Sequence, residues 1–442
     1  MAGYEDFIHL DYTPKPDDLI ASFKVKVPKW ETARRAVGAV ASESSVGTWA
    51  GVAALKYDHV QRVAAKVFHM SKDGWVKIAY PVDHFEANNM SQILASVAGN
   101  VFGMKAVESL RLEDIKWPKK IIKSFRGPQF GIKGVRKIFK VYDRPLTLSV
   151  PKPKVGMTTK EHADIGYKIW TGGLDLLKDD ENLTSQRFNP FQKRVALSLK
   201  LRDKAEQETG EKKSYLINVT APTFKEMEKR VKFVADHGNE FVMVDIITTG
   251  WMGVNSLREI CDDHHLAIHA HRAMHGAFTR NPEHGFSMLL VAEIARIIGV
   301  DSLHIGTAGV GKLVGSKDEV LEIEEHIIDQ HIKARLVHEK LKGEAGLHSL
   351  DEEWYGTKPV FPVTSGGLHP GIIAPVLDRI GTDVMAQFGG GVHGHLKGSH
   401  AGAKAARQAI QAYLEGVDVA DYAKKHVELA QALKQWGKWR PR

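Results

Sequence analysis

The feature that most restricts the possible folds is a series of eight short, apolar, largely β-branched runs beginning at residue 146. Between them, apolar residues recur at three- and four-residue spacing, as in amphipathic helices, for example in Thr223–His237, Glu283–Ile298 and His400–Leu414. Eight strand–helix units predict a (β/α)8 barrel, an α/β fold. The expected strands are Leu146–Val150, Leu174–Lys178, Tyr215–Val219, Phe241–Ile246, Leu266–Ala270, Leu303–Ile305, Val360–Thr364 and Val384–Phe388.

The residues before this series show a different pattern. Alternating runs at Ile20–Val27 and Trp75–Val82 predict strands, and helical periodicity covers Lys29–Ser44 and Glu86–Val97. We therefore expect a small α+β, ferredoxin-like domain in front of the barrel.

The Gly127-Pro128 pair breaks periodic structure and is the expected domain boundary. It divides an N-terminal domain, 1–126, from a barrel domain with C-terminal helices, 127–442. The charged stretch Ser316–Lys342 is interpreted as a long solvated helix after the sixth strand.

The composition is that of a soluble globular chain, with 43% hydrophobic and 26% charged residues. The net charge of +8 fits either nucleic acid or a site for multiply charged phosphates, but no Lys/Arg block is interleaved with aromatic residues, which argues against nucleic acid. The single cysteine, Cys261, excludes a disulfide within the chain and favours a reducing compartment. Without a signal sequence or a long apolar run, we expect a cytoplasmic protein.

Residues capable of chemistry cluster at the C-terminal ends of the expected strands, which converge on one face of a barrel. Lys178-Asp-Asp-Glu181 closes the second strand, and alternation places Lys178 and Asp180 on one side with Asp179 pointing away. Two carboxylates suit Mg²⁺, whereas a lysine nitrogen is a poor ligand. A carbamate, formed when a neutral lysine adds CO₂, would resolve this, with nearby Lys152 lowering the lysine pKa. The alternative is an ordinary polar strand exit.

The fifth strand ends in His269-Ala-His-Arg-Ala-Met-His275, with His269 and His271 on one face. Zinc binding, proton transfer and packed core histidines all remain open from this pattern, although the adjacent Arg272 would repel a cation and suits a phosphate.

The stretch Gly306–Lys312 matches the G-x-x-x-x-G-K pattern of a nucleotide-binding loop. Leu313 follows where such loops place Ser or Thr, so a flexible glycine loop carrying a mobile lysine is the preferred interpretation. The glycine groups at Ser365–Gly367 and Gly389–Gly391 end the last two strands, where barrels bind phosphate through backbone N–H groups. Together with Arg272 and His304, they suggest a bisphosphate ligand.

In this order, the motifs resemble the large subunits of ribulose-1,5-bisphosphate carboxylase/oxygenase (Rubisco), in particular the archaeal, form III-like branch without small subunits. The resemblance covers essentially the whole chain. The matching segments are Pro151–Lys154, Gly172–Asn182, His269–His275, Ser365–His369, Gln387–Gly391, Glu43–Trp49 and Gly99–Gly103.

The resemblance implies a Mg²⁺-dependent enzyme that adds CO₂ or O₂ to ribulose 1,5-bisphosphate. Lys178 matches the lysine that activator CO₂ converts to a carbamate, and Asp180 and Glu181 match the other ligands of one Mg²⁺ per active site. Lys152 and His271 match residues that exchange protons with the substrate.

The resemblance also implies an obligate homodimer with shared active sites, able to assemble further, without a small subunit, nucleic acid or membrane partner. Lys312 would close over the substrate, aided by Glu43 and Asn100 of the neighbouring subunit. The substrate-binding residues implied are Thr48, Trp49, Lys154, Arg272, His275, His304, Ser365, Gly366, Gly367, Gln387, Phe388, Gly389 and Gly390.

The sequence departs from the commoner family pattern at Val46, Val314 and Val392–Leu396, none of which supplies a primary catalytic group. Such departures bear on loop closure, phosphate affinity and CO₂/O₂ discrimination. The alternatives are a Rubisco-like enolase or isomerase on the same scaffold, or a phosphate- or nucleotide-binding module without chemistry. Archaeal relatives of this branch are associated with AMP and nucleoside salvage, a pathway that the sequence does not decide.

Overall fold

The computed structural model describes residues 3–50, 52–312, 315–334 and 348–438. They form two compact units, one made of 1–126, 274–297 and 329–357, the other of 127–273, 298–328 and 358–442. The units therefore divide in the sequence after Arg126, as does the proposed domain boundary, but two later segments belong to the first unit. The assignment of all of 127–442 to one domain stays a proposal.

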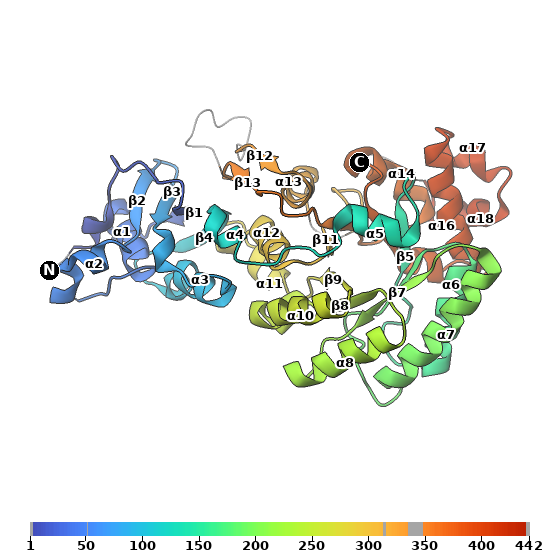
Figure 1. The fold of residues 1–442 in the computed structure, drawn as a ribbon. Coiled ribbons are helices and arrows are strands. Elements are labelled where there is room, and N and C mark those ends of the chain that lie inside the picture. The colour runs from blue at the N-terminus through green and yellow to red at the C-terminus, as the bar shows by residue number, and fades with distance from the viewer. Residues whose placement is uncertain (1–2, 51, 313–314, 335–347, 439–442) are drawn as a thin grey trace. The chain divides into compact units, whose positions relative to one another are not determined.

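The second unit is built on a closed, parallel eight-stranded barrel with the strand order β11-β14-β15-β5-β6-β7-β8-β9 (Figure 1). All eight predicted strands are confirmed, with ends shifted by one or two residues. The strands are β5 (Leu146–Ser149), β6 (Leu176–Lys178), β7 (Ser214–Asn218), β8 (Phe241–Asp245), β9 (Ala267–His271), β11 (Ser302–His304), β14 (Phe361–Thr364) and β15 (Met385–Phe388).

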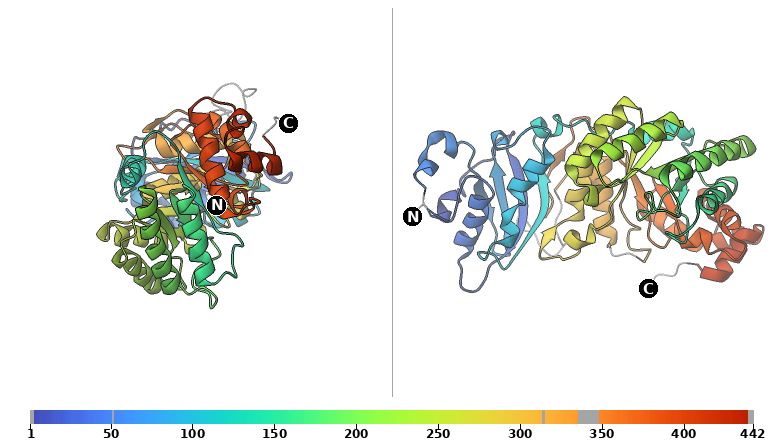
Figure 2. Two further views of the ribbon diagram at one scale, coloured as in Figure 1. Left: turned by 90° about the vertical axis from the view of Figure 1, so that its right-hand side faces the viewer. Right: turned by 90° about the horizontal axis from the view of Figure 1, so that it is seen from below.

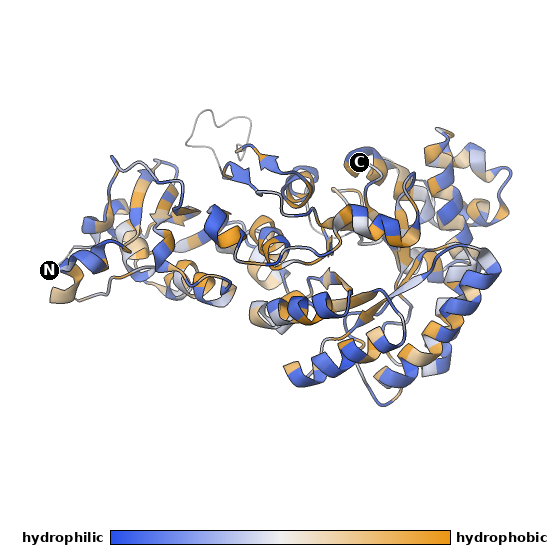
Figure 3. Cartoon of the chain, viewed as in Figure 1, coloured by the Kyte–Doolittle hydropathy of each residue, from blue (hydrophilic) through white to orange (hydrophobic). Residues whose placement is uncertain are grey.

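Helices cover the outside of the strands (Figure 2). Each helix carries both hydrophilic and hydrophobic residues (Figure 3). The barrel helices are α6 (Thr159–Thr171), α7 (Phe191–Thr209), α8 (Phe224–Asp236), α9 (Ile246–Thr249), α10 (Trp251–Asp263), α13 (Lys317–Ile328), α14 (Ile373–Ile380), α15 (Gly390–His393) and α16 (Ser399–Leu414). The C-terminal helices α17 (Val419–Ala423) and α18 (Val427–Trp436) pack against α16.

One end of the barrel is closed by α5 (Gly131–Phe139). Its Ile132, Val135 and Phe139 belong to one buried cluster with the first residues of several strands, among them Leu146 and Phe361. Because α5 packs at the N-terminal ends of the strands, the C-terminal ends are left to form the site.

The first unit contains a five-stranded sheet with the order β10-β4-β1-β3-β2. Predicted strands at β1 (Leu19–Lys26) and β3 (Trp75–Tyr80) and predicted helices at α1 (Ala33–Glu43) and α3 (Met90–Val97) are present. The sequence analysis missed β2 (Lys66–Met70) and β4 (Ser109–Lys116). The other described α-helices and strands are α2 (Asp58–Gln61), α4 (Lys119–Ile122), α11 (Gly276–Thr279), β10 (Gly285–Phe286), α12 (Met288–Ile298), β12 (His331–Ile332) and β13 (Glu352–Glu353).

Several helix predictions were wrong in extent, and the helices expected over Lys29–Ser44 and Glu86–Val97 begin only at Ala33 and Met90. The helix expected from Glu283 begins only at Met288, because Gly285 and Phe286 pair with β4 and the Ser287 hydroxyl then accepts the N–H of Leu290 in the first turn. The helix expected over Ser316–Lys342 ends at Ile328, since the chain next pairs with β13, and residues 335–342 lie outside the described part.

A buried ion pair at the closed end of the barrel generates a stability prediction. Asp175, 1% exposed, accepts two 2.7 Å bonds from Arg144 and further bonds from the N–H and hydroxyl of Thr147. Asp175→Ala leaves a buried guanidinium unpaired, so we expect the free energy of unfolding to fall by ~3 kcal/mol in urea denaturation. The control, Asp203→Ala, removes the largely exposed partner of Arg202 and should cost less than ~1 kcal/mol. Equal losses would contradict this.

Candidate active site

Lys178 ends strand β6 and is almost completely buried, with 1% of its surface exposed. Its Nζ donates a 2.9 Å hydrogen bond to the backbone oxygen of Asp179. Burial lowers the pKa of Lys178, although nearby carboxylates, Glu181 foremost, oppose the shift. A lysine with a lowered pKa is more readily available as a neutral amine, which is the form that reacts with CO₂.

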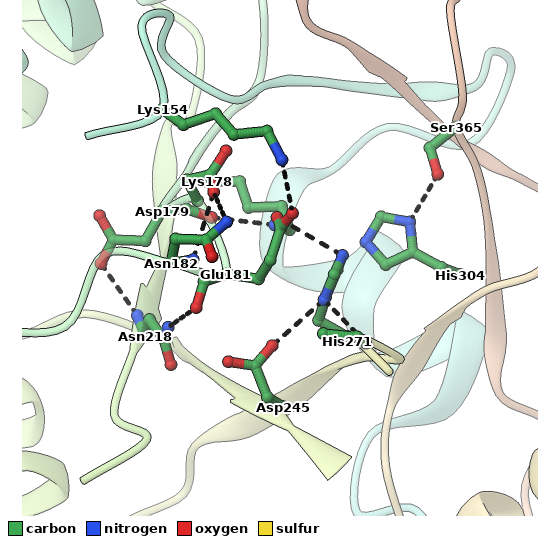
Figure 4. A network of polar contacts seen from close by, with 12 residues as sticks. Lys154, Lys178, Asp179, Glu181, Asn182, Asn218, Asp245, His271, His304 and Ser365 are labelled. Carbon is green, nitrogen blue, oxygen red and sulfur yellow. Dashed lines mark hydrogen bonds and ion pairs between the residues drawn. The ribbon is translucent and has the colours of Figure 1, made fainter. Parts of the chain in front are cut away.

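Glu181 lies beside Lys178 and is paired with Lys154 from the loop after β5 (Figure 4). Asp180 is paired with Lys152 from the same loop. Lys152 Nζ lies 2.8 Å from an oxygen of Asp180, and Lys154 Nζ lies 3.2 Å from one of Glu181. Burial alone would raise the pKa of Glu181, but neighbouring His271 and Lys178 lower it to about 2. Glu181 is therefore available as a carboxylate ligand.

Asp179 points away from this group, as strand alternation predicts, into a buried polar cluster behind β6. It accepts hydrogen bonds from the Tyr215 hydroxyl, the Asn218 N–H at 2.9 Å and an Arg194 nitrogen at 3.2 Å. His162 lies 3.4 Å from the same carboxylate. These bonds hold the backbone of Asp179, and thereby the direction of the residues on either side of it.

His271 ends strand β9, and its Nδ1 lies 3.1 Å from Asp245 Oδ1 at the end of β8. Its Nε2 lies 3.6 Å from Glu181, so one imidazole connects the acids of two strands (Figure 4). Burial and Lys178 lower the pKa of His271, which favours the neutral, proton-accepting ring. Burial also lowers the pKa of the next residue, Arg272, to about 10, so that it stays cationic at neutral pH.

Lys312 lies in the loop after β11, where its N–H bonds to Gly366 O at 3.0 Å. Gly367 has a φ of +87°, and a Cβ there would lie 2.9 Å from Lys312 Cγ. Glycine is therefore needed at Gly367 both for its backbone conformation and for the close approach of Lys312. The adjacent Leu313 and Val314 lie outside the described residues.

The ends of β14 and β15 bring in the other predicted binding residues. His304 Nδ1 lies 2.9 Å from the Ser365 hydroxyl, and a Cβ on Gly389 would lie 3.5 Å from Lys152. Gln387 is half-buried with an unpaired oxygen, whereas the side chain of Phe388 is fully buried and its backbone oxygen accepts a bond from Ser149. Gly390 begins the short helix α15.

The remaining predicted site residues belong to the first compact unit. Asn100 Nδ2 donates to Glu43 Oε1 at 3.0 Å, and both line a pocket of about 530 Å³ together with Trp49, which is 87% exposed. Thr48 is half-buried nearby in the sequence, and His275 Nδ1 lies 2.9 Å from the Thr279 hydroxyl.

Comparisons with known proteins agree along the whole chain. The model of the ribulose bisphosphate carboxylase large chain, catalytic domain, matches residues 131–436, and that of its N-terminal domain matches residues 6–121. The chain belongs to the ribulose bisphosphate carboxylase large-chain family.

Individual members of this family are similar over almost their full length. A ribulose bisphosphate carboxylase of Methanosarcina barkeri is 46% identical over 98% of this chain and 99% of its own, and one of Pyrococcus abyssi is 46% identical over 99% and 98%. Among solved structures, a dimeric archaeal Rubisco from Hyperthermus butylicus superposes with a TM-score of 0.91 at 44% identity, covering 99% of this chain and 100% of its own. An octameric Rubisco from Pyrococcus horikoshii gives 0.88 at 45% identity, covering 98% and 97%.

The sequence analysis missed some of the residues that shape the site. Asp245 was overlooked although an acid at the end of a barrel strand is a recognisable signal. The partners of Asp179, namely Tyr215, Arg194 and His162, carry no local signal because three separate elements supply them. Among the described residues, no helix is long and apolar enough to cross a membrane.

The lowered pKa of Glu181 predicts how stability depends on pH. Its folded pKa of about 2 lies below the unfolded value of ~4.3, so the carboxylate stabilises the fold fully above pH ~5, and this effect decreases below pH ~4 and is lost as the pH falls through ~2. In metal-free buffer, we expect the wild type to exceed Glu181→Gln in unfolding free energy by ~2 kcal/mol at pH 6 and by roughly half as much at pH 3. The control is Glu259→Gln, which changes an exposed glutamate and gives the difference in unfolding free energy expected without a buried carboxylate. A difference that grows on acidification would contradict the assignment.

Proposed function

We propose that this chain is the catalytic subunit of a ribulose bisphosphate carboxylase, a carboxy-lyase that adds CO₂, or O₂ in a side reaction, to the enediolate of ribulose 1,5-bisphosphate. Carboxylation gives two molecules of 3-phosphoglycerate. The observation that supports this best is the burial of Lys178 between Asp180 and Glu181 at the mouth of a barrel. Family membership over nearly the whole chain supports the same reaction.

The donor set fits Mg²⁺ once Lys178 is carbamylated. Asp180 and Glu181 supply two carboxylates, and a carbamate on Lys178 would supply a third oxygen donor. Neutral Lys178 plus CO₂ gives a carbamate and releases one proton, which turns a poor ligand into an anionic oxygen donor. Bound there, Mg²⁺ would polarise the substrate oxygens as a Lewis acid.

Proton transfer and charge stabilisation are assigned to residues around this group. Lys152 would exchange protons with the substrate, and His271, oriented by Asp245, would act as a further base. Lys312 would stabilise the new carboxylate when its loop closes. Arg272 and His304 would hold one phosphate, and the glycine backbones at Gly367, Gly389 and Gly390 the other, with Lys154, Ser365, Gly366, Gln387 and Phe388 lining the pocket.

The pocket of the first unit is proposed to complete the site of a neighbouring subunit in a homodimer. Glu43 and Asn100 are already joined by a hydrogen bond there. Trp49 is exposed, so that it and the adjacent Thr48 are available to contact the neighbouring subunit's site. His275 would line the same shared site. The dimeric assembly named for the Hyperthermus butylicus relative supports a dimer, and the octameric relative shows that members of this family also assemble further.

The rival activity is that of a Rubisco-like enolase or isomerase on the same scaffold. Relatives of that kind replace several of the carboxylase residues, whereas Lys152, Lys178, His271 and Lys312 are all present here together with Glu43 and Asn100. The complete set favours the carboxylase over the rival and over a binding module without chemistry.

Removing the amine of Lys178 should abolish carboxylation. After incubation with Mg²⁺ and bicarbonate, the wild type should convert ribulose bisphosphate to two 3-phosphoglycerates per turnover, and Lys178→Met should lower kcat by at least ~10³-fold because the metal loses a ligand. Exposed Lys168→Met on α6 is the matched control. Phosphoglycerate formation by Lys178→Met at the wild-type rate would refute the mechanism.

A shared site predicts complementation between two inactive variants. Glu43→Ala and Lys178→Met damage different subunits' contributions to one site, so a mixed dimer retains one intact site. Co-expression should therefore restore roughly a quarter of wild-type activity, because about half of the dimers are mixed and each has one working site of two. Two variants of the same unit, Lys152→Met and Lys178→Met, should not complement. If Glu43→Ala and Lys178→Met failed to complement each other on co-expression, the two subunits would not share an active site.

A further inference from the structure

A chain of four polar side chains runs from the barrel interior to its mouth. Ser302 Oγ lies 2.9 Å from His269 Nδ1, His269 Nε2 lies 3.1 Å from His304 Nε2, and His304 Nδ1 lies 2.9 Å from Ser365 Oγ. Ser302 and His269 are fully buried and His304 is 3% exposed, whereas Ser365 is half-buried at the end of β14. Figure 4 shows the outer end, where the His304 ring faces Ser365.

The contact between two ring nitrogens restricts where the protons of this chain lie. An Nε2–Nε2 distance of 3.1 Å is a hydrogen bond only if one nitrogen carries a proton and the other a lone pair. Burial, reinforced for His269 by Lys178, lowers its pKa well below the usual value, and burial together with His269 does the same for His304. Both rings are then neutral, and each carries a single N–H.

Two proton arrangements satisfy all three contacts. In the first, Ser302 donates to His269, His269 Nε2–H donates to His304, and His304 Nδ1–H donates to Ser365, whose own O–H is then left for the pocket. In the second, every bond is reversed, and Ser365 spends its O–H on His304. The tautomer of a residue that never reaches the pocket therefore decides whether Ser365 offers a donor or a lone pair.

The charge around the mouth selects between these arrangements. Arg272 is close enough to His304 to act on its pKa, and its cationic side chain favours an anionic ligand. We infer that His269 is a positioning residue, which fixes the tautomer of His304 so that the Ser365 hydroxyl donates to an anionic oxygen of the substrate. This inference rests on the proposed function for its ligand, a phosphorylated sugar, and extends the site to a residue with no substrate contact of its own.

A matched pair of substitutions separates this role from packing. His269→Gln keeps an N–H that can point at His304, whereas His269→Met has similar length without a polar hydrogen. We expect His269→Met to raise KM for ribulose bisphosphate about tenfold with a smaller change in kcat, since one directed hydrogen bond to a charged group is lost. His269→Gln should stay within about threefold of the wild type. Equal KM values for the two variants would overturn the inference.

A double-mutant cycle tests whether His269 acts through Ser365. In a Ser365→Ala background the hydroxyl that His269 controls is gone, so His269→Met should raise KM no further. Additive effects would show that His269 acts by another route and would overturn the inference. His395→Gln controls for the loss of an interior imidazole. The buried His395 ring hydrogen-bonds only to backbone groups of Glu428 and Lys397 in the described chain. Any effect of this substitution on KM should therefore add to that of Ser365→Ala.

Nitrogen NMR gives a readout that does not need turnover. In ¹⁵N-histidine-labelled wild-type protein with inorganic phosphate, His269 should be protonated at Nε2 and His304 at Nδ1, with the His269 signals assigned by their loss in His269→Gln. The opposite tautomers would overturn the inference. If the wild type forms no phosphoglycerate, the proposed function fails by itself, and these tautomers still decide the role of His269.

Discussion

The burial of the Lys178 amine is the constraint on which the rest of the site depends. An ammonium ion without partners is too costly in an interior, so the group must lose its proton or be surrounded by negative charge. Here burial lowers the pKa of Lys178, while Glu181 and Asp180 lie within electrostatic reach and oppose that shift. The same acids pair with Lys154 and Lys152, so the positive charge needed for a phosphorylated substrate is held at the mouth before any ligand arrives.

The barrel separates stability from chemistry along its axis. At the closed end, Asp175 and Asp301 each accept several hydrogen bonds from buried arginines and backbone N–H groups, which fasten α5 and the strand beginnings together. At the open end, Lys152, Lys312 and Ser365 lie in loops or at strand ends, where they can contact a ligand without disturbing the core. Substitutions at the closed end should accordingly affect stability, whereas those at the open end should also affect ligand binding and chemistry.

The sequence allowed the barrel and several residues of its mouth to be predicted, because strand periodicity is local and Lys178 and His271 end strands, with Asp180 shortly after the first of them. It failed where distant segments decide the outcome. Gly285–Phe286 pairs with β4 rather than extending α12, and α13 stops at Ile328 because the chain turns to pair with β13. The Asp179 cluster was missed for the same reason, since Tyr215 and Arg194 approach only after folding.

Two buried networks lie behind the mouth of the barrel. The cluster around Asp179 is charged, whereas the His269–His304 pair is neutral. Asp179 is held by Arg194 and by backbone and hydroxyl donors, a charged anchor suited to fixing a strand whose neighbouring residues would be drawn toward a divalent cation. His269 and His304 are neutral, and a neutral imidazole pair has no net charge to compete with a phosphate but does have a direction. In the proposed function, the metal subsite needs its ligands held in place and the phosphate subsite needs its donors to point outward. One barrel mouth would then have a separate interior network for each.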